Sequence, residues 1–487
     1  MTPAVRAFVG LLLDVIRGQQ LTIETQQRTI ETQQRRIVEL EAEVAELKQR
    51  LAKVEKFQHP ESPAVIAPPE PPASVTPPET AVETPPKVTR KRGGQPGHRK
   101  HSRALIPVEE CAAVVPVVPE TCRGCGETLS GVDADPLRHQ VWDIPEIKPL
   151  VTEYQRHRLT CSCCGTTTCG ELPVGVPIGQ TGPGLAALVT LLMVCFRLSK
   201  RRVSLFCKLL LNAPICPATV VKLQNIATAA TRPAYKTLVK RLPREPSVNA
   251  DETPTKQANR NAWIWVVVAA SYTVFAVRLT KAAEVIKELL TVNYAGIVTS
   301  DRAKMYLWCQ RLQWCWAHLK RDFEKIAQRP GPAGKYGQQL VDLTNEMFHH
   351  WHRVRDGTVT WRTFRGHYRR IQGEVYVALD EACCCADSAT VATCEQLLDR
   401  FDNLWHFAET GVIEPTNNAA ERALRHPVIW KQLSFGTQSA SGSRFVETLL
   451  TVLETCRQRR KNAYAYLTEA IKAHFAGKKP PSLLARV

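Results

Sequence analysis

The sequence predicts a multidomain α+β protein in which a helical insertion interrupts a mixed-sheet domain. Three observations predict this class. Two β-prone runs end on aspartates, at Asp251 and Asp301; an apolar hairpin lies between these runs; and a long helical stretch precedes a helix that carries Glu421. A chain of 487 residues is too long for one compact core, so we expect roughly three domains with connecting segments.

The charge of the chain favours a polyanionic partner. The formal net charge is +18 and the isoelectric point is about 9.3, which suits nucleic acid or an anionic membrane surface. The longest apolar run, Leu185 to Phe196, is shorter than the ~20 residues of a membrane span. The apolar patch at residues 7–16 contains Asp14 and leads into polar heptads, unlike a secretory signal. We therefore expect a cytoplasmic, nucleoid-associated protein that contacts no membrane.

The first 58 residues predict a coiled coil. Apolar residues recur every seven positions from Ile16 to Leu51, and Leu40, Leu47 and Val54 lie three positions after members of that series. This is the a/d pattern of a coiled coil and predicts a homodimer. The alternative is a single amphipathic helix that packs on its own protein.

A linker and a basic arm follow the heptads. Residues 59–86 are rich in proline and lack periodicity, which is typical of an extended linker. Residues 87–103 contain seven Lys or Arg and no acidic residue, as expected of an arm that neutralises DNA phosphates. A solvated basic tail is the alternative. The expected DNA-contacting residues of this arm are Arg90, Lys91, Arg92, Arg99, Lys100 and Arg103.

Two C-x-x-C pairs predict a zinc-ribbon-like module at residues 104–180. Most of the seventeen cysteines are scattered singly, but Cys122 with Cys125 and Cys161 with Cys164 have the spacing of metal knuckles. Two thiolate pairs complete a tetrahedral Zn²⁺ site, and a small β-rich insert is expected between them. Other cysteines compete as ligands, and incidental cysteines remain the alternative. The competing residues are Cys163 and Cys169.

Residues 181–245 predict three helices. A proline-containing break separates the last two, and this outline resembles a helix-turn-helix whose second helix enters the major groove. A helical packing domain without DNA contact is the alternative. The expected helices span about Gly184 to Leu198, Ser204 to Leu211 and Pro217 to Ala230.

From residue 246 the sequence pattern changes from one typical of helices to one typical of strands. A strand, a hairpin, a helix and further strands follow one another, which is the order of a ribonuclease-H-like mixed sheet flanked by helices. That fold places two carboxylates at neighbouring strand ends. The expected strands are Val248 to Asp251, Trp263 to Ala270, Tyr272 to Leu279, Gly296 to Ser300 and Gln313 to His318, with a helix from Ala282 to Leu290.

The third carboxylate is expected from Glu421. Thr416 or Asn417 can cap its helix, so that Glu421 projects from an early turn. Three carboxylates suit two Mg²⁺ ions, or Mn²⁺, that promote phosphodiester chemistry. Glu252 and Glu414 are alternative ligands. The helices expected in the preceding insertion are Tyr336 to Arg353, Arg362 to Ala382 and Ala392 to Glu409.

The predicted organisation has nine parts. They are a coiled coil (1–58), a linker (59–86), the basic arm (87–103), the zinc module (104–180), the helix-turn-helix-like domain (181–245), the first part of the ribonuclease-H-like domain (246–328), the helical insertion (329–410), the second part with the glutamate helix (411–476) and a tail (477–487).

Several motifs in this order resemble the insertion-sequence-66 family of DDE transposases. They read NADET, SDRAKMY, CWAHLKRDF and EPTNNAAERALR, with RKRGGQPGHRKH and the two knuckles upstream. The resemblance implies a ribonuclease-H-like domain with Asp251, Asp301 and Glu421 as its metal-binding triad, and a zinc-binding module. It also implies supporting residues that orient groups or contact phosphates. These are His318, Arg321, Asn418, Arg422 and Arg425.

The function that follows is DNA transposition. The resemblance implies double-stranded DNA as substrate, at the element's terminal inverted repeats and at target DNA, and accessory proteins encoded beside the transposase. We expect cleavage at the 3′ ends, followed by attack of the freed 3′ hydroxyl on target DNA. The alternatives are a catalytically inactive zinc-dependent DNA-binding protein and a nuclease on the same fold.

Overall fold

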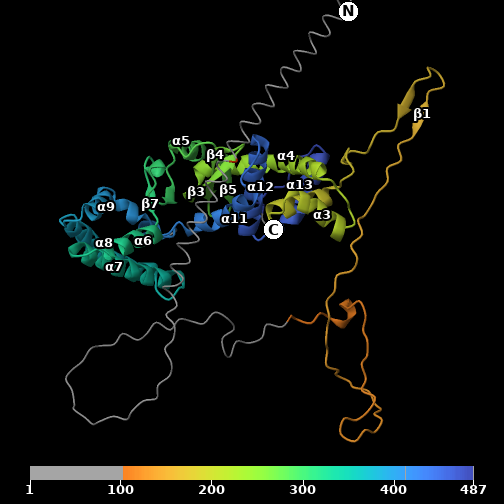
Figure 1. Ribbon diagram of the computed structural model, residues 1–487, viewed down its shortest axis with the longest axis horizontal. Helices are drawn as coiled ribbons and strands as arrows, with labels where there is room; N and C mark the ends of the chain where they lie inside the picture. Colours follow the sequence, from red (N-terminus) through yellow and green to blue (C-terminus); the bar gives the residue numbers. More distant parts are fainter. Residues whose placement is uncertain (1–33, 35–102, 412, 486–487) are drawn as a thin grey trace, which may run out of the picture. The chain divides into compact units, whose positions relative to one another are not determined.

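The computed structural model describes Gln34, residues 103–411 and residues 413–485 (Figure 1). The predicted coiled coil apart from Gln34, the linker, and the basic arm apart from Arg103 lie outside the described residues. The described chain divides between two compact units, of which Gly131 ends the first and Val132 begins the second. The second unit contains the main sheet and its flanking helices.

The centre of the second unit is a mixed five-stranded sheet in the order β5-β4-β3-β6-β7. In this sheet β3, β4 and β5 form an antiparallel meander, and β6 and β7 run parallel to β3. This α+β arrangement is compatible with a ribonuclease-H-like domain. The strands are β3 (Ser247–Gln257), β4 (Arg260–Val268), β5 (Thr273–Arg278), β6 (Ile297–Ser300) and β7 (Leu312–Trp314).

The prediction that a strand ends on Asp251 is wrong, because β3 continues to Gln257. The hairpin with β4 carries the strand onward, with Glu252 opposite Trp265 and Gln257 opposite Arg260. Asp251 therefore lies within a strand. By contrast, β6 ends at Ser300, directly before Asp301, as the sequence predicts.

The outer edge of the sheet is covered by α12 (Ala440–Gln458). Successive helical turns present Glu447, Thr451 and Thr455, which accept hydrogen bonds from the backbone N–H groups of β5 at 2.9 to 3.2 Å. An edge strand would otherwise expose a row of unpaired N–H groups. The helix thus closes the sheet on the side opposite β7.

The helices before the sheet pack with the C-terminal helix. They are α2 (Pro183–Val194), α3 (Lys200–Leu210), α4 (Pro217–Arg241) and α13 (Ala463–Phe475). The three predicted helices are present, but α4 continues past the predicted end at Ala230 and through Pro233. Tertiary contacts hold this extension, since the Tyr235 hydroxyl donates to the carbonyl of Phe275 at 3.1 Å. The helix-turn-helix role stays a prediction.

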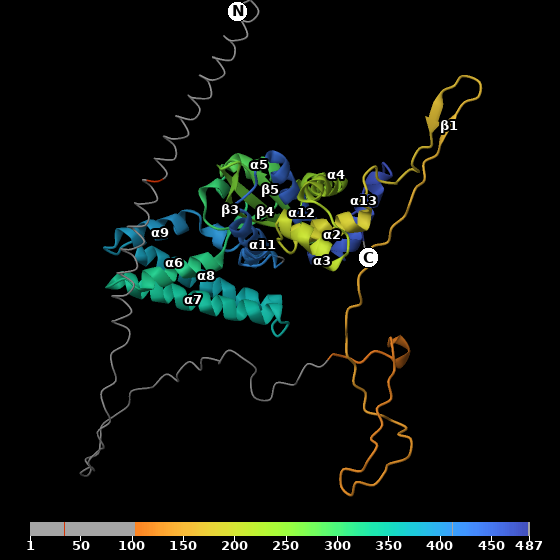
Figure 2. The ribbon, with the colours of Figure 1, turned by 45° about the vertical axis from the view of Figure 1, so that its right-hand side comes forward.

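A second group of helices lies beyond the β7 edge of the sheet, opposite the edge that α12 covers (Figures 1 and 2). It comprises α6 (Trp316–Ala327), α7 (Pro332–Arg355), α8 (Trp361–Ala382), α9 (Ser388–Asp399) and α10 (His406–Thr410). The last predicted insertion helix is therefore two helices, separated by a 3₁₀ turn at Phe401–Leu404. The group has an aromatic core in which Trp405 contacts Phe407 and Phe401.

The remaining elements are short. The helix predicted after the hairpin is α5 (Ala283–Leu290), and β1 (Arg158–Thr160) pairs with β2 (Thr167–Cys169) in a separate hairpin. Residues 129–157 contain neither strand nor helix, so the β-rich insert predicted between the knuckles is wrong. None of the described helices is both long enough and apolar enough to cross a membrane.

Candidate active site

The parallel pairing of β3 with β6 brings Asp251 and Asp301 to the same end of two neighbouring strands. Asn249 is in register with Thr299 in this pair, and each aspartate follows its strand's member of that pair by two residues. The two strands run in the same direction, so the aspartates lie beside each other where the pairing of β3 with β6 ends. The Asp301 carboxylate also accepts the backbone N–H of Ala303 at 3.0 Å.

The helix that carries Glu421, α11 (Asn418–Ser434), is fixed to β3 at both ends. At its start the Asn417 side chain donates to the carbonyl of Ala250 at 2.9 Å and accepts from Asn249 at 3.2 Å. Near its end the Lys431 ammonium donates to the Thr253 hydroxyl at 2.7 Å. Asn417 occupies the N-cap position but makes no side-chain cap bond; it holds the helix to the sheet instead.

These anchors put Glu421 on the face of β3 that carries Asp251. Side chains two residues apart along a strand point to the same face, so Asp251 shares a face with its neighbours Asn249 and Thr253. Both neighbours bond α11. Glu421 projects from the first turn of this helix and therefore faces the strand between the two anchors.

The electrostatics of Asp251 agree with this grouping. Burial, and then the charges of Glu252, Asp301 and Glu421, raise the pKa of Asp251 to about 7, although a backbone hydrogen bond from Glu252 opposes the rise. Several carboxylates near one another favour the neutral form of one of them unless a cation is present. The site is therefore short of positive charge.

Glu252, the alternative ligand, has its oxygens committed to other groups. Its side chain is 5% exposed; Oε1 lies 2.9 Å from the Lys281 ammonium, and Oε2 accepts from the Tyr306 hydroxyl at 2.8 Å. A buried carboxylate paired in this way ties β3 to the segments that carry Lys281 and Tyr306. Glu414, the other alternative, is exposed and lies before α11.

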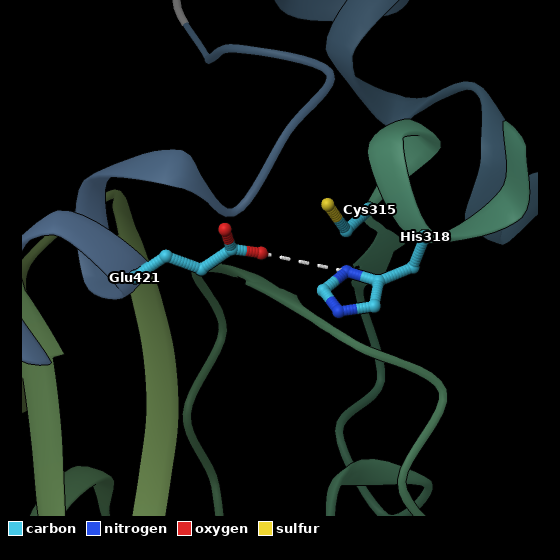
Figure 3. A group of neighbouring side chains, drawn as sticks. All are labelled: Cys315, His318 and Glu421. Carbon is cyan, nitrogen blue, oxygen red and sulfur yellow. Dashed lines mark ion pairs between the residues drawn. The ribbon is translucent and has the colours of Figure 1, made fainter. Parts of the chain in front are cut away.

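Glu421 faces α6 across the site (Figure 3). Its Oε1 atom lies 3.6 Å from His318 Nδ1 and 3.8 Å from Arg321 Nη2. His318 lies in the first turns of α6 because β7 ends at Trp314, so the predicted strand through His318 is wrong. Both Glu421 Oε1 and His318 Nδ1 are buried atoms without a hydrogen-bond partner. Polar atoms left this way can bind a polar or ionic group from outside the chain.

Asp251, Asp301 and Glu421 offer the carboxylates that suit a hard divalent cation, although neither aspartate belongs to the group of described residues whose ligand atoms lie within 4.8 Å of one another. Mg²⁺ and Mn²⁺ prefer carboxylate oxygens, and the unsatisfied Glu421 oxygen is available. Cys315 Sγ also lies near His318 and Glu421, with the ligand atoms within 4.8 Å of one another. However, this sulfur accepts the backbone N–H of Asn417 at 3.1 Å, and burial raises the pKa of Cys315, so its thiol helps to fix the start of α11.

The other predicted supporting residues lie along the start of α11. Asn418 is half-buried, whereas Arg422 and Arg425 are exposed. Sequence reasoning missed Asn417 as an anchor, together with Cys315 and Lys431. Only their position inside the quoted motifs could have drawn attention to Asn417 and Cys315, because their partners lie far away in the chain.

The two cysteine knuckles have the same local geometry. In each, the glycine after the second cysteine donates to the carbonyl of the first cysteine at 2.9 Å, from Gly126 to Cys122 and from Gly165 to Cys161. Both glycines have positive φ, at 79° and 70°. Cys164 therefore corresponds to Cys125, and the extra Cys163 corresponds to a glycine. Hydrogen bonding with the Thr166 hydroxyl lowers the pKa of Cys164, which favours its thiolate, the form in which a cysteine can bind a metal ion.

Two family models match the chain. The model for the Transposase IS66 family matches residues 179–444, and the model for the zinc-finger binding domain of transposase IS66 matches residues 119–165. The first match contains the sheet and all three acidic residues; the second contains both knuckles, supports Zn²⁺ binding and ends before Cys169. Comparison with curated proteins finds no similar protein. The family suggested by the sequence motifs is thus confirmed: the chain belongs to the IS66 family and is a transposase of an insertion element.

Proposed function

We propose that this transposase cleaves and joins DNA strands at a divalent-metal centre held by Asp251, Asp301 and Glu421. The observation that supports it most is the anchoring of α11 to β3 through Asn417, with Asp251 on the same strand face. A buried Glu421 oxygen without a hydrogen-bond partner is the second support. Two Mg²⁺ ions, or Mn²⁺, are the cations that this donor set suits.

The residues of the site have distinct roles in this proposal. Bound divalent ions would neutralise charge on the attacked phosphate and activate the attacking oxygen. The three carboxylates would hold those ions; in this proposal His318 orients Glu421, and Arg321 contacts a DNA phosphate. Water attacks the phosphodiester at each element end and the bond to the 3′ oxygen breaks, which frees a 3′ hydroxyl. That hydroxyl then attacks a target phosphodiester in line and displaces another 3′ oxygen.

The test compares cleavage with binding on DNA that contains the element's inverted repeats. We expect Asp251→Asn, Asp301→Asn and Glu421→Gln each to lower strand cleavage by about 10³-fold or more, while end binding persists. Full strand transfer by any one variant would overturn the triad. Binding without nicking by the unaltered protein would indicate an inactive DNA-binding protein, and hydrolysis without joining would indicate a nuclease.

For the zinc module we propose Cys122, Cys125, Cys161 and Cys164 as ligands, from their spacing and the family match. Metal analysis of the purified chain should find close to one zinc. Replacing Cys164 by serine should lower the zinc content, whereas replacing Cys163 by serine should not. The reverse result would make Cys163 the ligand in place of Cys164.

The remaining partners follow from the sequence. We propose that residues 1–58 form a homodimer and that the basic arm and the zinc module bind the inverted repeats, with the protein at the nucleoid and accessory proteins of the element beside it. A monomeric mass of the full chain in light scattering would contradict the dimer.

A further inference from the structure

A pocket of about 650 Å³ lies beside the candidate active site, between α6, α7 and the start of α11. Ala317, Thr416 and Asn418 line its inner side, and the last two flank the anchor residue Asn417. Arg321 both lines the pocket and lies 3.8 Å from Glu421 Oε1. The pocket therefore shares Arg321 with the candidate active site.

The lining residues of the pocket are mostly cationic or neutral. Lys320 and Arg321 contribute two positive charges from α6. Lys320 donates to Asn345 Oδ1 of α7 at 2.6 Å, which holds its ammonium between the two helices. The carboxylate among the lining residues, Glu324, lies 4.0 Å from Lys320. This distribution suits a phosphate close to Arg321.

The α7 wall presents flat rings. Phe348 is half-buried and stacks on exposed His352, with ring centroids 6.0 Å apart and planes inclined by 26°. His349, also exposed, lines the same wall. Aromatic and imidazole rings next to cations form the kind of surface on which unstacked nucleobases bind. The volume lies in the range of pockets for small ligands, which suits a single nucleotide.

We propose that this pocket receives one unstacked nucleotide of the DNA strand next to the scissile phosphate. The base lies against Phe348 and His352, and its phosphate lies beside Lys320 and Arg321. This inference rests on the proposed function, because it takes the reacting phosphate to lie at Glu421. It assigns the helical insertion a role in selecting the position of the cut, since extruding a nucleotide fixes the strand's register.

The test is photocrosslinking of the full-length protein to end-containing DNA. A 5-iodouracil replaces one base at a time across the boundary between element and flank, and crosslinked peptides are mapped by mass spectrometry. We expect one position to crosslink strongly to the segment of α7 that contains Phe348 and His352. Crosslinks spread evenly over all positions, or mapped outside the pocket, would overturn the proposal.

Variants sharpen the result. His352→Ala changes an exposed ring, so it should fold normally, and we expect it to lower the crosslink yield at that position by about fivefold or more. Phe348→Leu should lower it further. The matched control is Tyr376→Leu, which removes an exposed aromatic ring of α8 that does not line the pocket. An equal fall in the control, or no fall in His352→Ala, would count against the pocket.

The experiment also separates this inference from the proposed chemistry. It measures bound DNA and is repeated with Asp251→Asn, so cleavage is not required. If the triad variants still cleave DNA and the α7 crosslink is also present, the metal centre is misassigned and the pocket stands. If the triad variants fail as expected and the crosslink is absent, the pocket alone is rejected.

Discussion

Two glutamates on helices packed against the same sheet have opposite surroundings. Glu447 of α12 is 4% exposed, and both of its oxygens are paired inside the chain: Oε1 lies 2.7 Å from Arg232, and Oε2 lies 3.1 Å from Arg278 and accepts the backbone N–H of Val277 at 3.0 Å. Glu421 of α11 is 35% exposed and has an oxygen without a hydrogen-bond partner.

The difference distinguishes a structural charge from a binding charge. A buried carboxylate that is fully paired ties elements together, and breaking the pair leaves an uncompensated charge. Glu421 Oε1 lies 3.6 Å from His318 and 3.8 Å from Arg321 but accepts no hydrogen bond, so this oxygen can still bind a group from outside the chain. Glu447 therefore holds α12 and α4 to β5, whereas the role that we propose for Glu421 is to bind a cation.

The largest expected effect comes from exchanging each glutamate for glutamine. Glu447→Gln should destabilise the fold by about 3 kcal/mol, because Arg232 loses its counter-charge and Arg278 keeps only Glu288, yet the folded fraction should cleave DNA normally. Glu421→Gln should leave the thermal midpoint unchanged or higher and should lower cleavage by about 10³-fold or more. Calorimetry and a cleavage assay on both variants check this. Loss of stability by Glu421→Gln with normal cleavage would reverse the comparison.

Much of the sheet region could be predicted from the sequence because its signals are local. The apolar run of β4 and the turn before β5 specify a hairpin, and Asp301 follows a short β-branched strand. The same local signals predicted α7 and α8 of the insertion to within a few residues, but they merged α9, the 3₁₀ turn and α10 into one helix. Their patterns can be recognised in the sequence because β5 and β6 are buried along nearly their whole length and each helix buries one face.

What the sequence could not supply depends on distant partners. Asn417 has the position and residue type of a helix cap, but Asn249 and Ala250 occupy its side chain. Pro233 usually ends a helix, but α4 continues because its later turns contact β5. Glu252 resembles a ligand in the motif and is committed to Lys281. Each outcome was decided by a residue far along the chain.

A smaller effect is expected at His318, whose Nδ1 atom lies 3.6 Å from Glu421 Oε1. His318→Ala should lower cleavage by about 10–100-fold and raise the Mg²⁺ concentration needed for half-maximal activity, as for partners that orient metal ligands. His318→Asn keeps an N–H donor near the position of Nδ1 and should restore part of the activity. The matched control is His474→Ala, on an exposed position of α13. An unchanged Mg²⁺ requirement in His318→Ala would contradict the orienting role.

The smallest effect concerns the free energy of unfolding that is lost because the Asp251 carboxylate is buried beside other carboxylates. The pKa of Asp251 is raised from 3.8 to about 7 in the metal-free fold, so the folded state binds the proton more tightly than the unfolded state does. Stability from this group is full below pH 3.8 and is lost as the pH rises through about 7. Asp251→Asn does not titrate, so at pH 8 without metal it should be more stable than the unaltered chain by about 1–2 kcal/mol. At pH 4 the two proteins should melt alike, and Mg²⁺ should stabilise the unaltered chain more than the variant. Thermal melts at both pH values, with and without Mg²⁺, check this; an unaltered chain that melts above Asp251→Asn at pH 8 without metal would mean that the site is as well paired as Glu447.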